Sequence, residues 1–191
     1  MVAINPLLRF NPLEPPGPYE ATFPDSVTVG YEFSISEEKI VNKLGVYHPQ
    51  GPSGFIQPVT LKLWSSDGSP VLLLTTSIPA GACSNLVNDF CWVSVPETTL
   101  SAVSTGTRYV VGAFYPLDPV YGQNPLISGY PLLDLEVIEP SSSYLGGYVA
   151  FGDTYPNISS PIDAAYYFGP NISFKKEKGK GLKVSFIGNP A

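Results

Sequence analysis

The residue types that most often carry enzyme chemistry are scarce in this chain. His48 is the only histidine, and Pro49 follows it directly. A histidine before a proline is more typical of a turn than of a general base. One histidine and two cysteines at this spacing do not form a zinc site, and no nucleophile-elbow or phosphate-loop motif occurs. We therefore expect a protein that is not an enzyme, with no catalytic residue, no cofactor and no metal.

The two cysteines are the next candidates. Cys83 and Cys91 lie eight positions apart, between two predicted strands. A disulfide across that connection would contribute about 2 kcal/mol or somewhat more to stability. The alternative is a pair of small, half-buried thiols, and one pair of cysteines does not identify the redox compartment.

Carboxylates in the long loops leave one further chemistry open. Two such groups could hydrolyse a glycosidic bond or bind Ca²⁺, but their spacing does not resemble a calcium loop, so we expect solvated side chains. The residues concerned are Asp118, Asp134, Glu136, Asp153 and Asp163.

Composition narrows the class of protein. The net charge is -6, which argues against a nucleic-acid partner, and no apolar run approaches the length of a membrane helix. The first residues lack the basic lead and apolar core of a secretory signal peptide, so we expect either no export by that route or a signal that has been removed. Proline and glycine are frequent, at 21 and 18 residues, and prolines at this density break helices, while tyrosine, valine, threonine and isoleucine favour strands.

The strongest structural pattern lies in residues 59–78. Val59, Leu61 and Leu63 alternate with polar residues, and the turn-forming Asp67-Gly68 precedes a second apolar segment. The pattern predicts a β-hairpin. Further strands are expected at 27–35, 40–47, 90–95, 107–115, 132–138, 148–151, 166–174 and 182–187.

Nine or ten strands with frequent turns predict an all-β, antiparallel β-sandwich of the jelly-roll or immunoglobulin-like type, with a barrel as the alternative. One domain, residues 27–191, follows from a single hydrophobic core. The loops at 116–131 and 153–161 are expected to connect strands.

Residues 1–26 form a proline-rich arm with apolar residues between the prolines. Such a segment is extended and lies either over its own domain or across a neighbouring subunit. For the second case we expect partner contacts from Leu7, Leu8, Phe10, Leu13 and Tyr19.

A lysine-rich segment lies near the other end. Residues 175–183 hold five of the ten basic residues and read as a charged hairpin tip. A solvated turn is the simplest interpretation, and contact with an acidic surface is the alternative. The residues assigned to partner binding are Lys175, Lys176, Lys178 and Lys180.

Five segments, which occur in a fixed order along the chain, are similar to segments of a known family. These are Val-Gly-Tyr-Glu-Phe at 29–33, Leu-Gly-Val-Tyr at 44–47, Val-Thr-Leu-Lys-Leu-Trp-Ser-Ser-Asp-Gly at 59–68, Thr-Arg-Tyr-Val-Val-Gly-Ala at 107–113 and Phe-Gly-Pro-Asn-Ile-Ser-Phe at 168–174. Over residues 27–174 the chain resembles a domain of unknown function from bacterial exported proteins, which often end in a PEP-CTERM sorting signal. The resemblance implies a β-sandwich module, sometimes beside carbohydrate-active domains, with no catalytic residues.

Two functions follow from these observations. The first is a structural protein of a symmetric homo- or hetero-oligomeric assembly, most specifically a virion component such as a bacteriophage capsid decoration or cement protein, assembled in the host cytoplasm and docking through its arm. The second is an extracellular or cell-surface module for carbohydrate binding or adhesion. Tyrosine combines an apolar ring with a polar tip and suits sugar contacts, so we assign possible glycan contacts to Tyr121, Tyr130 and Tyr155.

Overall fold

The computed structural model describes residues 4, 6–10, 19–21, 25–48, 55–102, 107–117, 127–131, 135–137, 141–159, 166–167 and 169–176. Its fifteen strands are β1 (Leu8–Phe10), β2 (Tyr19–Ala21), β3 (Val27–Ile35), β4 (Lys39–Tyr47), β5 (Val59–Ser65), β6 (Val71–Ile78), β7 (Leu86–Val87), β8 (Phe90–Leu100), β9 (Arg108–Tyr115), β10 (Ile127–Pro131), β11 (Leu135–Val137), β12 (Ser142–Phe151), β13 (Ile158–Ser159), β14 (Tyr166–Tyr167) and β15 (Pro170–Phe174). No helix among these residues is long and apolar enough to cross a membrane.

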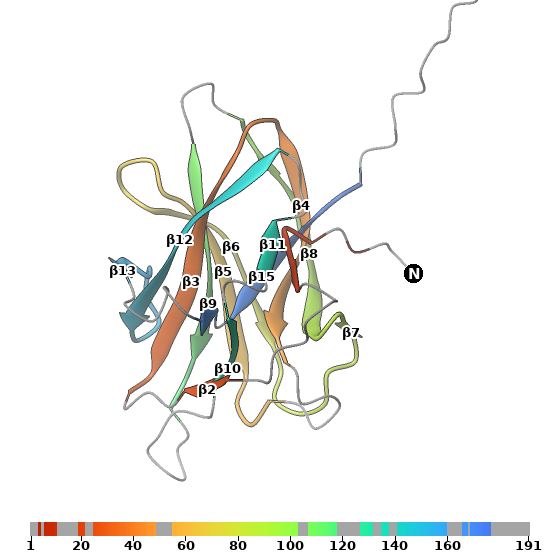
Figure 1. Cartoon of the computed structure of the whole chain (residues 1–191), viewed down its shortest axis with the longest axis vertical. Coiled ribbons are helices and arrows are strands. Elements are labelled where there is room, and N and C mark those ends of the chain that lie inside the picture. The colour runs from red at the N-terminus through yellow and green to blue at the C-terminus, as the bar shows by residue number, and fades with distance from the viewer. Residues whose placement is uncertain are drawn as a thin grey trace, which may run out of the picture.

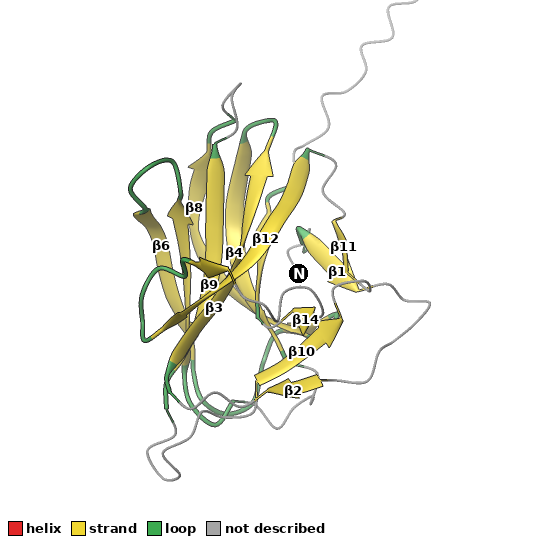
Figure 2. Cartoon of the chain, turned by 60° about the vertical axis from the view of Figure 1, so that its left-hand side comes forward, coloured by secondary structure: helices red, strands yellow, loops and turns green. Residues whose placement is uncertain are grey.

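Two antiparallel sheets form the sandwich, which confirms the predicted all-β class. The six-stranded sheet has the order β13-β12-β3-β9-β5-β6, and the four-stranded sheet has the order β15-β4-β8-β7. Figure 2 shows the remaining short strands, β1, β2, β10, β11 and β14, to one side of these sheets. In Figure 1 the long strands β3 and β12 run obliquely from the upper right to the lower left.

Alternation along the long strands builds the core, as the sequence predicts. Tyr31 and Phe33 in β3 are fully buried, and Leu61 and Leu63 in β5 are buried with them. Each apolar side chain removed from water contributes about 1.5–3 kcal/mol. The register of the predicted hairpin runs from Val59 opposite Ile78 to Ser65 opposite Val71.

The four-stranded sheet is buried on both faces at the end of β4 and the start of β8, whereas β7 and most of the rest of β8 are partly or fully exposed. Leu44 and Val46 point to one face of β4, and Tyr47, whose partner in β8 is Phe90, points to the other. All four side chains are buried.

Several predicted boundaries are wrong. The expected loop at 116–131 contains β10, the expected loop at 153–161 contains β13, and β12 is much longer than the strand expected at 148–151. The β7–β8 hairpin was not predicted. β10 and β12 pair with strands that are distant in the sequence, and β7 and β13 have two residues each, which is too few to show an alternation. The strand expected at 182–187 lies outside the described residues.

Candidate interaction surfaces

The first residues of the arm belong to the sandwich. Leu7 is fully buried, its backbone N–H donates to the carbonyl of Ile172 at 2.8 Å, and Pro6 bridges Ser173. These residues therefore extend the four-stranded sheet beyond β15. The prediction that Leu7 contacts a partner is corrected, because its side chain is part of this chain's own core.

The other arm residues assigned to partner binding have mixed outcomes. Leu8 and Phe10 are the ends of β1, which pairs with β11, and Tyr19 begins β2, which pairs with β10. The backbone of this part of the arm therefore pairs with later parts of the same chain. Leu13 lies outside the described residues.

The basic segment is only partly described. Lys175 donates to both carboxylate oxygens of Glu97, at 2.7 and 2.8 Å, and Lys176 is exposed. An exposed ion pair of this kind contributes at most about 1 kcal/mol. Lys178 and Lys180 lie outside the described residues, so their assignment stays a prediction.

The cysteines form a disulfide. Cys83 and Cys91 are bonded, with their Cα atoms 5.8 Å apart, and the bond ties the connection after β6 to the start of β8. This settles the alternative that the sequence left open. Structural disulfides are typical of proteins at cell or virion surfaces and in other oxidising surroundings.

Of the tyrosines assigned to glycan contact, the described side chain is that of Tyr155. Its ring meets Trp64 edge-on with a centroid distance of 5.5 Å, so part of it is occupied within the fold. Burial raises the pKa of Tyr155, the Glu32 carboxylate raises it further, and a hydrogen bond with Ser66 lowers it. Tyr130 is in β10, and Tyr121 lies outside the described residues.

Glu32 is the centre of a polar cluster that the sequence analysis did not identify. This buried carboxylate accepts a hydrogen bond from Ser66 Oγ at 2.9 Å and one from the hydroxyl of Tyr148 at 3.4 Å. The guanidinium of Arg108 lies 3.5 Å away. The carboxylate thus has two hydrogen-bond donors and one ion-pair partner, which is typical of a buried structural charge.

The loop carboxylates do not assemble into a site in the part of the structure that is described. Asp153 forms an ion pair with Lys62 at 2.7 Å, and Glu136 is in β11. Asp118, Asp134 and Asp163 lie outside the described residues. Within the described residues, no group of three or more histidine, cysteine or acidic side chains could hold a metal ion.

His48 is packed within the fold. Its side chain is buried, its ring lies 4.3 Å from that of Phe55, and its backbone N–H donates to the carbonyl of Asp89 at 2.7 Å. These contacts join the end of β4 to the β7–β8 hairpin and the segment before β5. His48 itself is therefore held by tertiary contacts, and the loop predicted after it lies outside the described residues up to residue 54.

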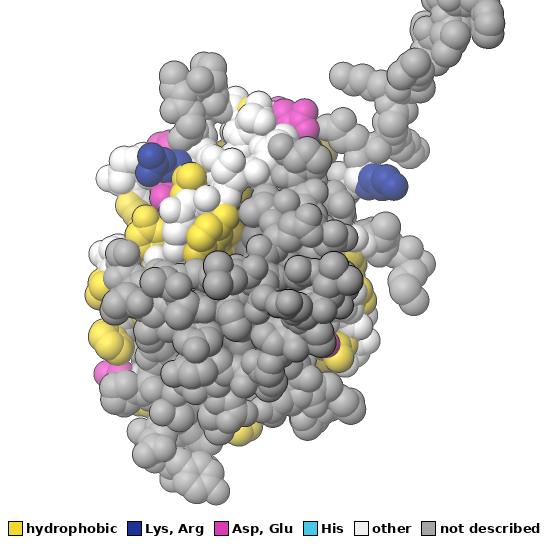
Figure 3. Space-filling view, viewed as in Figure 1, with side chains coloured by type: hydrophobic (Ala, Val, Ile, Leu, Met, Phe, Trp, Pro, Cys, Tyr) yellow, Lys and Arg dark blue, Asp and Glu magenta, His cyan; other side chains and the backbone are white. Residues whose placement is uncertain are grey.

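Apolar side chains reach the surface at both ends of the six-stranded sheet. On the β6 edge, Val71 is 55% and Leu72 is 48% exposed. At the opposite end, Phe151 of β12 is 57% and Ile158 of β13 is 50% exposed, and Leu145 is also exposed. Figure 3 shows hydrophobic side chains along the left margin of the molecule, where β12 and β13 lie in Figure 1.

No family model, curated protein or solved structure matches this chain. The resemblance to the exported-protein domain therefore stays a prediction, and function has to be argued from the geometry above.

Proposed function

We propose that the chain is a non-enzymatic structural subunit of a symmetric assembly, and specifically a virion component of the capsid-decoration or cement type. The observation that carries this proposal is the exposure of apolar side chains at both ends of one sheet. Leu72 marks the β6 end and Phe151 the β12 end. Two separate apolar edges give each subunit two different contact surfaces.

Exposed sheet edges are normally protected in monomeric proteins, because unpaired strand backbone and apolar side chains invite association. The exposed residues at the start of β6 are Val71 and Leu72, with no charged residue between Gly68 and Ile78. A contact between the β6 edge of one copy and the β12–β13 edge of the next is head-to-tail, and such contacts close into rings when the rotation allows.

The arm has a smaller part in this proposal than the sequence suggested. Since Leu7 completes the core, its removal would damage the fold rather than an interface. The sheet edges take over the docking role. The disulfide supports exposure of the chain at a virion surface, where such bonds persist.

The native mass of the purified protein tests the proposal. We expect an oligomer by light scattering, and dissociation when lysine replaces an apolar residue at either edge, in Leu72→Lys or Phe151→Lys. A charge placed in an apolar contact is desolvated, so each variant should weaken association at least about tenfold, or roughly 1.4 kcal/mol. Ile56→Lys is the matched control, because Ile56 is 66% exposed but lies on neither edge.

Mixing the two edge variants makes the test specific for head-to-tail contact. Each variant retains one intact edge, so the mixture should form dimers and nothing larger. A monomeric wild-type protein, or a mixture that stays monomeric, would contradict the proposed contact. Mass spectrometry of density-purified virus particles from the source tests the virion assignment separately, since the assignment requires the chain to be among their proteins.

An extracellular module for adhesion or carbohydrate binding is the second candidate. The disulfide supports it equally, because cell-surface proteins share the oxidising environment. A glycan-array screen combined with the native mass separates the candidates, since a glycan-binding module does not require an oligomer.

A further inference from the structure

The contacts of His48 join three segments at one corner of the sandwich. His48 follows β4, its backbone N–H donates to the carbonyl of Asp89 in the β7–β8 turn, and its ring lies 4.3 Å from that of Phe55. Phe55 and Gly81 exchange two backbone hydrogen bonds, at 3.0 and 2.8 Å. His48 is therefore linked directly to the far end of the segment 81–89 and, through Phe55, to its beginning.

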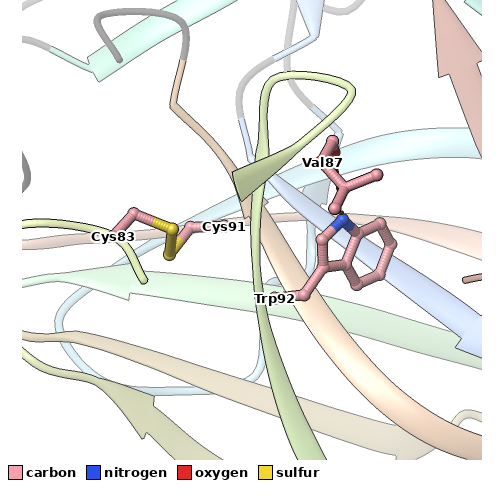
Figure 4. The surroundings of a disulfide bond; sticks show 4 residues. All are labelled: Cys83, Val87, Cys91 and Trp92. Atoms are coloured by element: carbon pink, nitrogen blue, oxygen red, sulfur yellow. Dashed lines mark hydrogen bonds between the residues drawn. A yellow bond between two sulfur atoms is a disulfide. The ribbon is translucent and has the colours of Figure 1, made fainter. Parts of the chain in front are cut away.

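The hairpin held at this corner is short. β7 has two residues, and Asn88 and Asp89 have φ of 51° and 62°, the left-handed conformation of a two-residue hairpin turn. Figure 4 shows the disulfide on one side of the β8 backbone and Val87 and Trp92 on the other. The disulfide fixes the hairpin at Cys83, whereas His48 fixes it at the turn.

The imidazole of His48 is shielded from water. The residue is 7% exposed, and its Nε2 atom is buried. Burial disfavours the charged form of an imidazole, because the charge loses its hydration. Contact with a phenyl ring offsets only part of that loss. The packed arrangement therefore favours the neutral ring.

Few charged groups face this ring. Among the described residues of the segments packed around it, 55–58, 79–90 and 169–170, the one carboxylate is that of Asp89, an exposed residue whose backbone carbonyl makes the contact. Cys83 and Cys91 are bonded and do not titrate, and Tyr47 stays neutral between pH 5 and 8. The loop residues 49–54 carry no titratable side chain.

We propose that His48 is a pH switch for the β7–β8 hairpin, which is released when the ring takes up a second proton under mildly acidic conditions. In an opened or unfolded chain a histidine binds this proton with a pKa of about 6.5. The packed ring resists protonation, so the stability of the corner is full above that pH and falls as the pH drops through it. Release uncovers Phe55 and adds to the exposed apolar surface of Leu86 and Val87. The switch is independent of the proposed assembly role.

Nuclear magnetic resonance tests the protonation step directly, because His48 is the only histidine and its ring signals need no further assignment. The full-length protein is titrated from pH 8 to pH 4.5. We expect the ring to titrate with a midpoint below the ordinary value of about 6.5. A midpoint at or above that value would show that the fold favours the charged ring and would overturn the proposal.

Hydrogen exchange tests the release of the hairpin. The reporting amides are those of Phe55, Gly81 and Trp92, which donate to carbonyls at this corner. After correction for the intrinsic effect of pH, their protection should fall at least about fivefold between pH 7.5 and pH 5. Protection at Val111, in the other sheet, should stay constant. Constant protection at all of these amides, or an equal fall at Val111, would contradict a switch at this corner.

Two variants assign the effect to the histidine. His48→Gln keeps a polar side chain that does not titrate, and the difference in protection between the two pH values should disappear. Asp89→Asn is the matched control, because asparagine also tolerates the turn conformation and only the carboxylate is lost. This variant should keep the pH dependence. The opposite result in either variant would overturn the proposal, and if His48→Gln does not fold, the wild-type titration and Asp89→Asn still decide. The native mass at pH 7.5 judges the assembly role separately.

Discussion

The two tryptophans of this protein occupy comparable places in the two sheets but have different surroundings. Trp64 lies over Gly112 in the six-stranded sheet, where an added Cβ would be 2.9 Å from the ring. Trp92 lies over Gly45 in the four-stranded sheet at similarly short distances. In both sheets a glycine makes room for an indole ring on the neighbouring strand.

What covers each ring differs. Trp64 is covered by Tyr155, from a segment that Asp153 anchors to Lys62 through an ion pair. Trp92 is held by the β7–β8 hairpin, where its indole N–H donates to the carbonyl of Val87, and its ring packs against Phe90. Both indoles are nearly fully buried, since Trp64 is 6% and Trp92 is 3% exposed. A later segment of the chain covers Trp64, whereas the hairpin that contains Trp92 encloses that residue.

The largest expected loss of stability comes from adding a methyl group at the two glycines that face the indole rings. Gly45→Ala places a methyl group against the fused part of a fully enclosed indole, and we expect a loss of about 3 kcal/mol in the free energy of unfolding. Gly112→Ala meets the outer end of the Trp64 ring and the methyl group of Thr28, and should cost about 1–2 kcal/mol. Urea unfolding measures both losses.

Gly68→Ala is a poor control for this pair because Gly68 has φ of 77°, which an alanine adopts with strain. Ala80→Gly is preferable, because Ala80 is exposed and lies outside the strands. Equal losses at Gly45 and Gly112 would show that the two tryptophans are equally free to move and would remove the contrast drawn above.

Removal of the disulfide should cause the next largest loss in the free energy of unfolding. The double variant Cys83→Ser, Cys91→Ser removes a bond that closes a short loop, and the loss should be about 2–3 kcal/mol. We expect the damage to be local to the β7–β8 hairpin. Hydrogen exchange should therefore quicken at Trp92 and its neighbours and stay slow at Val111 in the centre of the other sheet. Equally faster hydrogen exchange in both sheets would show that the disulfide does not stabilise the hairpin locally.

The long elements were predictable because their signal is local. The strand at 27–35 and the hairpin at 59–78 follow from alternation and from Asp67-Gly68, and the structure reproduces their limits. The β7–β8 hairpin carried a readable signal as well, since Asn88-Asp89 stands between the apolar residues Val87 and Phe90.

The surfaces were less predictable because they depend on distant segments. Glu32 lies on the polar side of its strand and would be expected in water, yet it is buried because Tyr148, 116 positions later in the sequence, returns to contact it. Leu7 reads as part of an arm, and only its pairing with Ile172 makes it a core residue. No local pattern indicates either contact.

The smallest expected effect concerns Tyr155, the residue that covers Trp64. At pH 7, Tyr155→Phe removes a hydroxyl group that interacts with Ser66 and should cost at most about 1 kcal/mol, while the ring still covers the indole.

The pKa of Tyr155 is raised in the folded state, whereas in the unfolded chain a tyrosine has a pKa of about 10. Above that pH the unfolded chain loses the proton first, so stability falls as pH rises. The variant lacks this proton, so the gap in unfolding free energy between wild type and variant should narrow from pH 9 to about 11. Urea titrations at both pH values measure the gap, and a gap that stays constant or widens would show that Tyr155 is too open to solvent to seal the region around Trp64.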